Sequence, residues 1–174
     1  MFPLNIRNDE ISFFDIKLEH LPLILEWYNK VDDFKFATGL DAPISLAELT
    51  RRYAEVAVCG SEFFVGIYSF AEKRMVGILK GSVGLTHKDA VWIGSIVIGT
   101  GFQKRGFGSL AVKMLLQHMK NSCRIREAYL AVIESNMQGR AFWMKNGFKE
   151  LREMGKRIKL HNTFQSVIIM HRVI

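Results

Sequence analysis

The chain has 174 residues, of which 49% are hydrophobic, and its formal net charge at pH 7 is +7. This length and composition suit one compact domain with a sizeable core, and the absence of any run of about 18 apolar residues excludes a membrane-spanning helix. Its two cysteines, Cys59 and Cys123, form no CxxC pair and no Cys/His cluster, which argues against a disulfide framework and against a structural metal. No secretory signal is visible at the start of the sequence, so we expect a cytoplasmic protein with free thiols.

Hydrophobic periodicity and turn residues predict an alternation of strands and helices. The predicted strands span 11–17, 62–70, 74–83, 90–98, 127–133, 148–157 and 164–172. The predicted helices span 21–28, 45–58, 110–119 and 136–145. Ser45 begins the second helix and Glu48 follows three residues later, which is the pattern of a capping box. This order predicts a mixed sheet with helices on both faces, in a single domain over 1–174 without internal linkers.

The turn between the fourth predicted strand and the third predicted helix carries the clearest chemical signal. Gln103, Gly106 and Gly108 form a Q-x-x-G-x-G pattern there. Glycines leave the backbone bare, so several N–H groups can point at one anion, and the start of the helix adds partial positive charge. Lys104 and Arg105 add full charges. The turn therefore predicts a phosphate or pyrophosphate site, whereas a tight turn with solvated basic residues is the alternative.

Two other phosphate-binding patterns do not fit this turn. A Walker A loop needs Lys before Ser or Thr at its end, and here Ser109 follows Gly108 directly. The dinucleotide fingerprint needs a different glycine spacing, although Glu134 does end the next predicted strand.

The turn resembles the acetyl-CoA loop of the GNAT superfamily of acyl-CoA N-acyltransferases, whose usual pattern is Q/R-x-x-G-x-G/A. A second segment, Asn136 to Phe148, resembles the family's N-x-x-A-x-x-F-Y-x-K-x-G-F signature. Gly139 and Trp143 depart from it, at the usual Ala and Tyr places. The resemblance is good from about Met75 onward and looser before. It implies an α/β (α+β) fold with a mixed, mostly antiparallel central sheet that is splayed beside the cofactor.

The resemblance also implies which residues bind acetyl-CoA as the co-substrate. Ile96, Val97 and Ile98 would offer backbone groups to the pantetheine arm, as an added strand does. The turn would hold the pyrophosphate. The full set of expected cofactor-binding residues is Ile96, Val97, Ile98, Gln103, Lys104, Arg105, Gly106, Phe107, Gly108, Ser109, Asn136 and Trp143. Asn136 is either a helix N-cap or also a partner of the cofactor arm.

Trp143 stands where many family members carry the tyrosine that protonates the leaving thiolate. An indole N–H donates a hydrogen bond but is no acid near neutral pH, so the usual general acid is missing. Direct attack of an amine on the thioester is still expected, because a thiolate with a conjugate pKa near ~8.5 leaves readily. Glu134 is the first candidate for the general base, with His87 and Asp89 as weaker candidates. A water chain without a single base is the alternative.

Charge is unevenly divided along the chain, since residues 1–74 carry a net −4 and residues 75–174 a net +11. The basic part suits the phosphates of coenzyme A, and its scattered charges do not favour nucleic acid. The acidic part favours a cationic amine acceptor.

Residues 24–33 loosely resemble a GNAT branch whose members acetylate ribosomal-protein N-termini, polyamines and aminoglycosides. In that segment, and just after it, an ammonium group could meet carboxylates or aromatic faces. The residues concerned are Asp32, Asp33, Asp41, Trp27 and Phe34. Ordinary core and loop positions are the alternative for all of them.

Three further expectations concern activity and partners. The first is an N-acetyltransferase acting on a primary amine of a small molecule or a peptide. The alternative is a non-catalytic or regulatory acyl-CoA-binding domain in which Trp143 marks lost acid chemistry. A homodimer is also possible, for instance through pairing of the last strand, 164–172. No membrane partner is expected.

Overall fold

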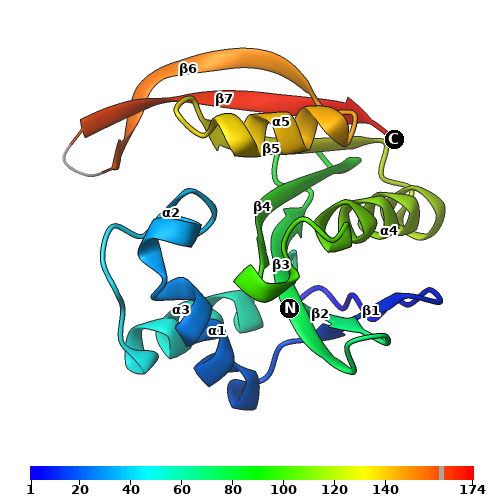
Figure 1. Cartoon of the computed structure of the whole chain (residues 1–174). Helices are drawn as coiled ribbons and strands as arrows, with labels where there is room; N and C mark the ends of the chain where they lie inside the picture. Colours follow the sequence, from blue (N-terminus) through cyan, green and yellow to red (C-terminus); the bar gives the residue numbers. More distant parts are fainter. Residues whose placement is uncertain (161–162) are drawn as a thin grey trace.

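In the computed structural model, which describes residues 1–160 and 163–174, a seven-stranded sheet lies between two groups of helices (Figure 1). The strands are β1 Ile11–Asp15, β2 Glu62–Ser69, β3 Arg74–Val83, β4 Ala90–Ile98, β5 Glu127–Ile133, β6 Lys149–Leu160 and β7 Thr163–Val173. The helices are α1 Leu21–Tyr28, α2 Val31–Thr38, α3 Leu46–Val58, α4 Phe107–Cys123 and α5 Met137–Lys145, with short 3₁₀ turns η1 Leu18–His20 and η2 Thr100–Phe102.

The sheet is mixed and mostly antiparallel, as the sequence predicts. Its strand order is β1-β2-β3-β4-β5-β7-β6, and only the β4–β5 pair is parallel. That parallel pairing extends only from Ala90↔Glu127 to Ile93↔Leu130. Beyond it β4 stays paired with β3 and β5 stays paired with β7, so the two strands separate. The expected splay of the sheet is therefore confirmed.

Two apolar cores hold the helices on opposite faces of this sheet. One core joins α4 and Trp143 of α5 to residues of β4, β5 and β7. The side chains of Ala111, Leu115 and Met119, which recur every four residues along α4, are buried in it. The other core joins α1, α2 and α3 to the opposite face, which includes Val97 of β4. Helices on both faces are thus confirmed. No helix of the described ranges is long and apolar enough to cross a membrane.

Most element boundaries agree with the predicted ones to within about two residues. The helix α4 is longer than predicted, since it spans Phe107–Cys123 rather than 110–119, and β6 ends at Leu160 rather than at 157. α2 was not expected, because we interpreted its first residues as a loop after α1. It begins after Lys30 without a side-chain cap and ends at Thr38, and the next residue, Gly39, has a φ of +68° that suits glycine. The capping box of α3 is half formed, since Ser45 Oγ accepts from the N–H of Glu48 at 3.2 Å. The Glu48 carboxylate instead accepts hydrogen bonds from Arg51 and Arg52.

The last strand does not offer an edge for pairing with a second chain along most of its length. From Val167 to Val173, β7 has β5 on one side, and β6 pairs with it on the other. The suggestion that residues 164–172 could pair across a dimer is therefore wrong for this part of the strand. The outer strand on this side of the sheet is β6.

Candidate functional site

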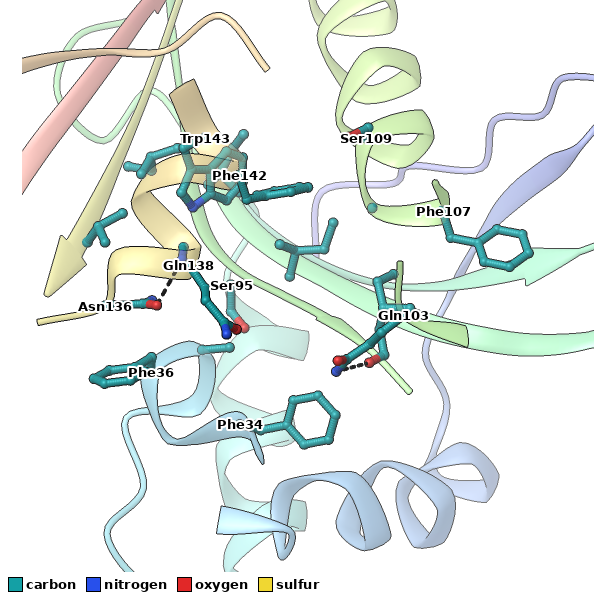
Figure 2. A pocket seen from close by; sticks show the side chains of 18 of the residues that line it. Phe34, Phe36, Ser95, Gln103, Phe107, Ser109, Asn136, Gln138, Phe142 and Trp143 are labelled. Carbon is teal, nitrogen blue, oxygen red and sulfur yellow. Dashed lines mark hydrogen bonds between the residues drawn. The ribbon is translucent and has the colours of Figure 1, made fainter. Parts of the chain in front are cut away.

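A cavity of about 450 Å³ opens where β4 and β5 separate. The segment from η2 into α4 forms one wall, and α2 and α5 complete the lining. Figure 2 shows Phe34 and Phe36 of α2 on one side of this space, and Phe142 and Trp143 of α5 with Asn136, which precedes that helix, on the other. The cavity therefore combines elements that lie far apart in the sequence.

A bulge in β4 marks the point of separation. Lys80 pairs with Ser95 and the next residue of β3, Gly81, pairs with Ile93, so Gly94 is left without a partner in the register. After this bulge the edge of β4 that faces the cavity has no neighbouring strand. Unpaired backbone groups at a strand edge are the groups that bind an added, extended chain. The resemblance placed this edge at Ile96, Val97 and Ile98, and all three lie beyond the bulge.

The glycine-bearing loop presents its backbone to the same cavity. Within the described residues, the backbone N–H groups of residues 104–109 donate to no acceptor. Two left-handed residues, Lys104 with a φ of +59° and Gly106 with a φ of +90°, shape the turn just before α4. The Gln103 side chain donates from Nε2 to the Ile98 carbonyl oxygen at 3.1 Å, which ties the loop to the end of β4. Free N–H groups at a helix start favour binding of an anion such as a phosphate.

Asn136 is an N-cap, which was one of its two expected roles. Its Oδ1 accepts from the N–H of Gly139 at 2.9 Å. A Cβ on Gly139 would come within 2.3 Å of Asn136 Nδ2, so the glycine that departs from the family signature leaves room for this cap. At the other end of α5, Asn146 Nδ2 donates to Ser109 Oγ at 3.2 Å and so joins α5 to the start of α4.

Trp143 is both a core residue and a lining residue. Its side chain is 8% exposed and packs edge-to-face on Phe142 at 4.9 Å and on Phe148 at 5.2 Å between ring centroids. The indole N–H donates to no acceptor among the described residues. The indole can therefore offer one hydrogen bond to a ligand in the cavity.

The expected cofactor-binding residues mostly meet at this cavity. Those that line it are Ile96, Ile98, Gln103, Lys104, Gly106, Phe107, Gly108, Ser109, Asn136 and Trp143. The Val97 side chain does not line it, because alternation along β4 turns that side chain into the core beneath α1–α3. Arg105 does not line it either, since its guanidinium pairs with Glu72 and lies over the rings of Phe102 and Phe107.

The expected acid–base residues lie outside the lining. Glu134 is exposed in the turn after β5. His87 and Asp89 precede β4, at the opposite end of the strand from the glycine loop. The Tyr129 hydroxyl donates a hydrogen bond to Glu127 Oε2, and His87 Nε2 lies 2.8 Å from the same oxygen. Both contacts lower the pKa of Glu127, that of Tyr129 more. This group is a separate cluster at the base of the sheet.

Sequence reasoning missed part of the lining. Ser95, next to the bulge, and Gln138 of α5 both face the cavity. The α2 residues Asp33, Phe34, Phe36 and Ala37 also line it. We had weighed Asp33 and Phe34 as substrate contacts, but no spacing in the sequence indicated that α2 would lie against the splayed strands. The one signal for a helix here was the pair Asp32 and Asp33 in its first turn, because carboxylates are favoured at the start of a helix.

The family model described as the Acetyltransferase (GNAT) family matches residues 24–148. The chain belongs to the GNAT acetyltransferase family. This match confirms the resemblance drawn from the two sequence signatures. It also extends the resemblance back to α1, where the sequence alone gave only a loose likeness.

Solved GNAT structures share the fold of this chain. Spermidine N-acetyltransferase from Vibrio cholerae, in complex with CoA and spermine, has a TM-score of 0.82 at 17% identity, over 95% of this chain and 96% of that chain. An acetyltransferase from Salmonella typhimurium that modifies the N-terminal serine of ribosomal protein L7/L12 has a TM-score of 0.82 at 19% identity, over 96% of both chains. No curated protein sequence matches this chain.

Acetyl-CoA is the co-substrate of GNAT enzymes, and the residues of this cavity fit it. The unpartnered N–H groups of residues 104–109 suit a pyrophosphate, and Lys104 adds a positive charge on the same wall. The unpaired edge of β4 suits the amide-bearing pantetheine arm. The two features adjoin along one cavity, as a long, extended ligand requires.

Proposed function

We propose that this chain is an acetyl-CoA-dependent N-acetyltransferase that moves an acetyl group to a primary amine of a small molecule or peptide. Residues 1–174 would act as one domain. The observation that carries the proposal is the continuity between the open edge of β4 and the unpartnered N–H groups of residues 104–109 in a single cavity. The two similar structures described above support an amine acceptor, because both of those proteins acetylate amino groups.

Different segments along the cavity would bind different parts of acetyl-CoA. The backbone of residues 104–109 would hold the pyrophosphate, and the backbone of Ile96 to Ile98 would pair with the pantetheine arm. The thioester would then lie near Ser95 and Trp143, at the bulge end of the open edge. Held there, the thioester carbonyl is presented to the acceptor in a fixed orientation, which is the main source of acceleration in a direct transfer.

In that transfer, the amine nitrogen forms a bond to the thioester carbonyl carbon as the carbon–sulfur bond breaks. Starting from the ammonium form, the nitrogen loses one proton before attack and a second one after it, and the departing thiolate of coenzyme A either gains a proton or stays ionised. Because an alkyl ammonium with a pKa near ~10 is mostly charged at pH 7, the rate should rise with pH. The indole N–H of Trp143 could donate to the sulfur but could not protonate it.

The group that accepts the amine proton is the next part of the proposal, and the positions of the carboxylates bear on it. Glu134 is exposed outside the lining, whereas Asp33 of α2 is a carboxylate within it. Because Glu134 lies outside the lining, we propose that it is not an essential base and that the amine proton leaves to water in the cavity, with the carboxylate of Asp33 as the alternative acceptor. Glu134→Gln should then keep kcat/KM within about threefold of the original. A loss of about a hundredfold or more, with folding intact, would restore Glu134 as the base.

The second candidate is a binding or regulatory domain that holds acyl-CoA without transferring the acyl group. One observation favours it, namely Trp143 at the place where the family usually has a tyrosine. Amine-dependent thiol release separates the two candidates, since only a transferase couples release to the amine.

A location in the cytoplasm stays part of the proposal, supported by the free thiols of Cys59 and Cys123.

The test is acetyl-CoA-dependent thiol release near pH ~8 with a panel of polyamines, aminoglycosides, amino acids, amino-acid amides and peptides. Gly106→Trp places a bulky side chain in the lining of the loop and should abolish release. Gly101→Trp is the matched control, because Gly101 lies outside the lining and a Cβ there meets nothing within 4 Å. Circular dichroism of both variants checks folding, since the φ of +90° at Gly106 strains any other residue.

A further inference from the structure

A second, smaller cavity of about 210 Å³ lies beneath the helices α1, α2 and α3. Residues of β2, β3 and β4 form its floor. Most of its lining is apolar or aromatic. Its polar groups include those of Tyr28, Arg52, Tyr53, Lys80 and Ser95. A volume of this size admits a molecule about as large as an amino acid.

The two cavities meet at the bulge of β4. Gly94 and Ser95 line both of them. Ser95 Oγ is buried and has no hydrogen-bond partner in the part of the chain that the structure describes. A buried hydroxyl without a partner is costly, so a ligand that hydrogen-bonds to it is favoured. An acceptor seated in the smaller cavity would therefore reach the thioester end of the larger one at Ser95.

The smaller cavity is positively charged. Its charged lining residues are Arg52 of α3 and Lys80 of β3, and no Asp or Glu belongs to the lining. Among the described residues, the half-buried Lys80 ammonium has no hydrogen bond and no ion pair. A ligand that carries only ammonium groups would be repelled by these charges, whereas a ligand that also carries an anionic group would supply a partner for Lys80.

Arg52 keeps donors for a ligand although it is already paired once. Its Nε donates to Glu48 Oε1 at 2.8 Å, and the same oxygen accepts from Arg51 at 2.9 Å. One carboxylate thus serves two guanidinium groups. The terminal nitrogens of Arg52 donate to no described residue, and the planar fork of a guanidinium matches a carboxylate. Tyr28, which is almost fully buried, adds a hydroxyl that donates to no described group.

We propose that the acceptor is a small amine that also carries a carboxylate, such as an amino acid. Lys80 and Arg52 bind the carboxylate in the smaller cavity, and the amine lies at Ser95. This inference rests on the proposed function and names the substrate class for it. It departs from the expectation of a polycationic acceptor, because the acidic residues of the first part of the chain do not line this cavity.

The test compares free L-amino acids with their carboxamides, which keep the shape and remove the negative charge. The original protein should use the free acids with a kcat/KM about 10- to 100-fold higher. Lys80→Met should raise KM for the acids by about tenfold or more, with little change in kcat, and should leave the amides unchanged. Lys120→Met is the matched control, since Lys120 is an exposed lysine of α4 that lines neither cavity.

Equal use of acids and amides, or the same preference in Lys80→Met, would overturn the inference while leaving the transferase in place. Calorimetry keeps the two proposals separable if no acceptor is acetylated. N-acetyl amino acids and N-acetyl amino-acid amides are titrated into the CoA-saturated protein. Tighter binding of the acids that is lost in Lys80→Met would support the carboxylate site even if the transferase proposal failed. Equal binding of both sets would overturn it.

Discussion

Trp143→Phe isolates the contribution of the indole N–H, because the change keeps an aromatic ring in the same place. Trp143 is 8% exposed and contacts the rings of Phe142 and Phe148. The smaller ring leaves part of that space empty, which should lower the free energy of unfolding by about 1–3 kcal/mol. For a chain of this length, that loss corresponds to a fall in Tm of about 2–12 °C.

Trp143→Phe should lower the rate without abolishing it. The hydrogen bond from the indole N–H to the departing thiolate is charge-assisted, so its loss should cost about 1.5–3 kcal/mol, which is about a 13- to 160-fold fall in kcat/KM. The assay is thiol release at saturating acetyl-CoA, well below the Tm of both proteins. Trp143→Tyr is the companion variant, because it supplies the hydroxyl common in the family. Its kcat should stay within about tenfold of the original, since the thiol of CoA is itself acidic enough to leave.

Two results would refute this reasoning. A fall in kcat of about a thousandfold in Trp143→Phe, with the fold and CoA affinity retained, would show that the indole does far more than donate one hydrogen bond. A rise of about a hundredfold in Trp143→Tyr would show that a missing general acid limits the reaction.

Three further predictions concern the loop and two tyrosines. Gln103→Ala removes the hydrogen bond to the Ile98 carbonyl and should raise the Kd for CoA about 2- to 13-fold in calorimetry; an unchanged Kd would contradict a bracing role. Burial raises the pKa of Tyr28 to about 12, so the folded protein should lose about 3 kcal/mol of unfolding free energy as pH rises from about 10 to 12. Tyr28→Phe should reduce that alkaline loss in urea titrations, and an identical loss would count against it. A hydrogen bond from Tyr129 holds the pKa of Glu127 below its ordinary value. The ionised carboxylate therefore stabilises the fold above about pH 4.5, and this stabilisation is lost as the pH falls further. Tyr129→Phe should raise that pKa in an NMR titration and lessen the acid loss, and an unmoved pKa would refute the assignment.

Much of the fold was predictable because its signals are local. A continuous apolar run predicted β4, the amphipathic spacing predicted α4, and the glycine pattern placed the turn between them. α2 escaped because it is short and begins without a side-chain cap. Its single buried residue, Phe34, gives no periodicity to recognise.

The site was less predictable where long-range contacts decide it. Arg105 forms an ion pair with Glu72, which lies in the turn between β2 and β3, and no spacing in the sequence predicts that pair. The overall charge division likewise favoured a cationic acceptor. The structure instead brings Arg52 of α3 and Lys80 of β3 together in one small cavity. Net charge along a segment says little about which charges face a ligand.

The most direct test of the central claim is the mass of an acceptor amine after incubation with acetyl-CoA and the protein. The account predicts one acetyl group on the nitrogen with the original protein and with Gly101→Trp, and none with Gly106→Trp. Tight binding of acetyl-CoA without acetylation of any amine in the panel would contradict the transferase and favour an acyl-CoA-binding domain.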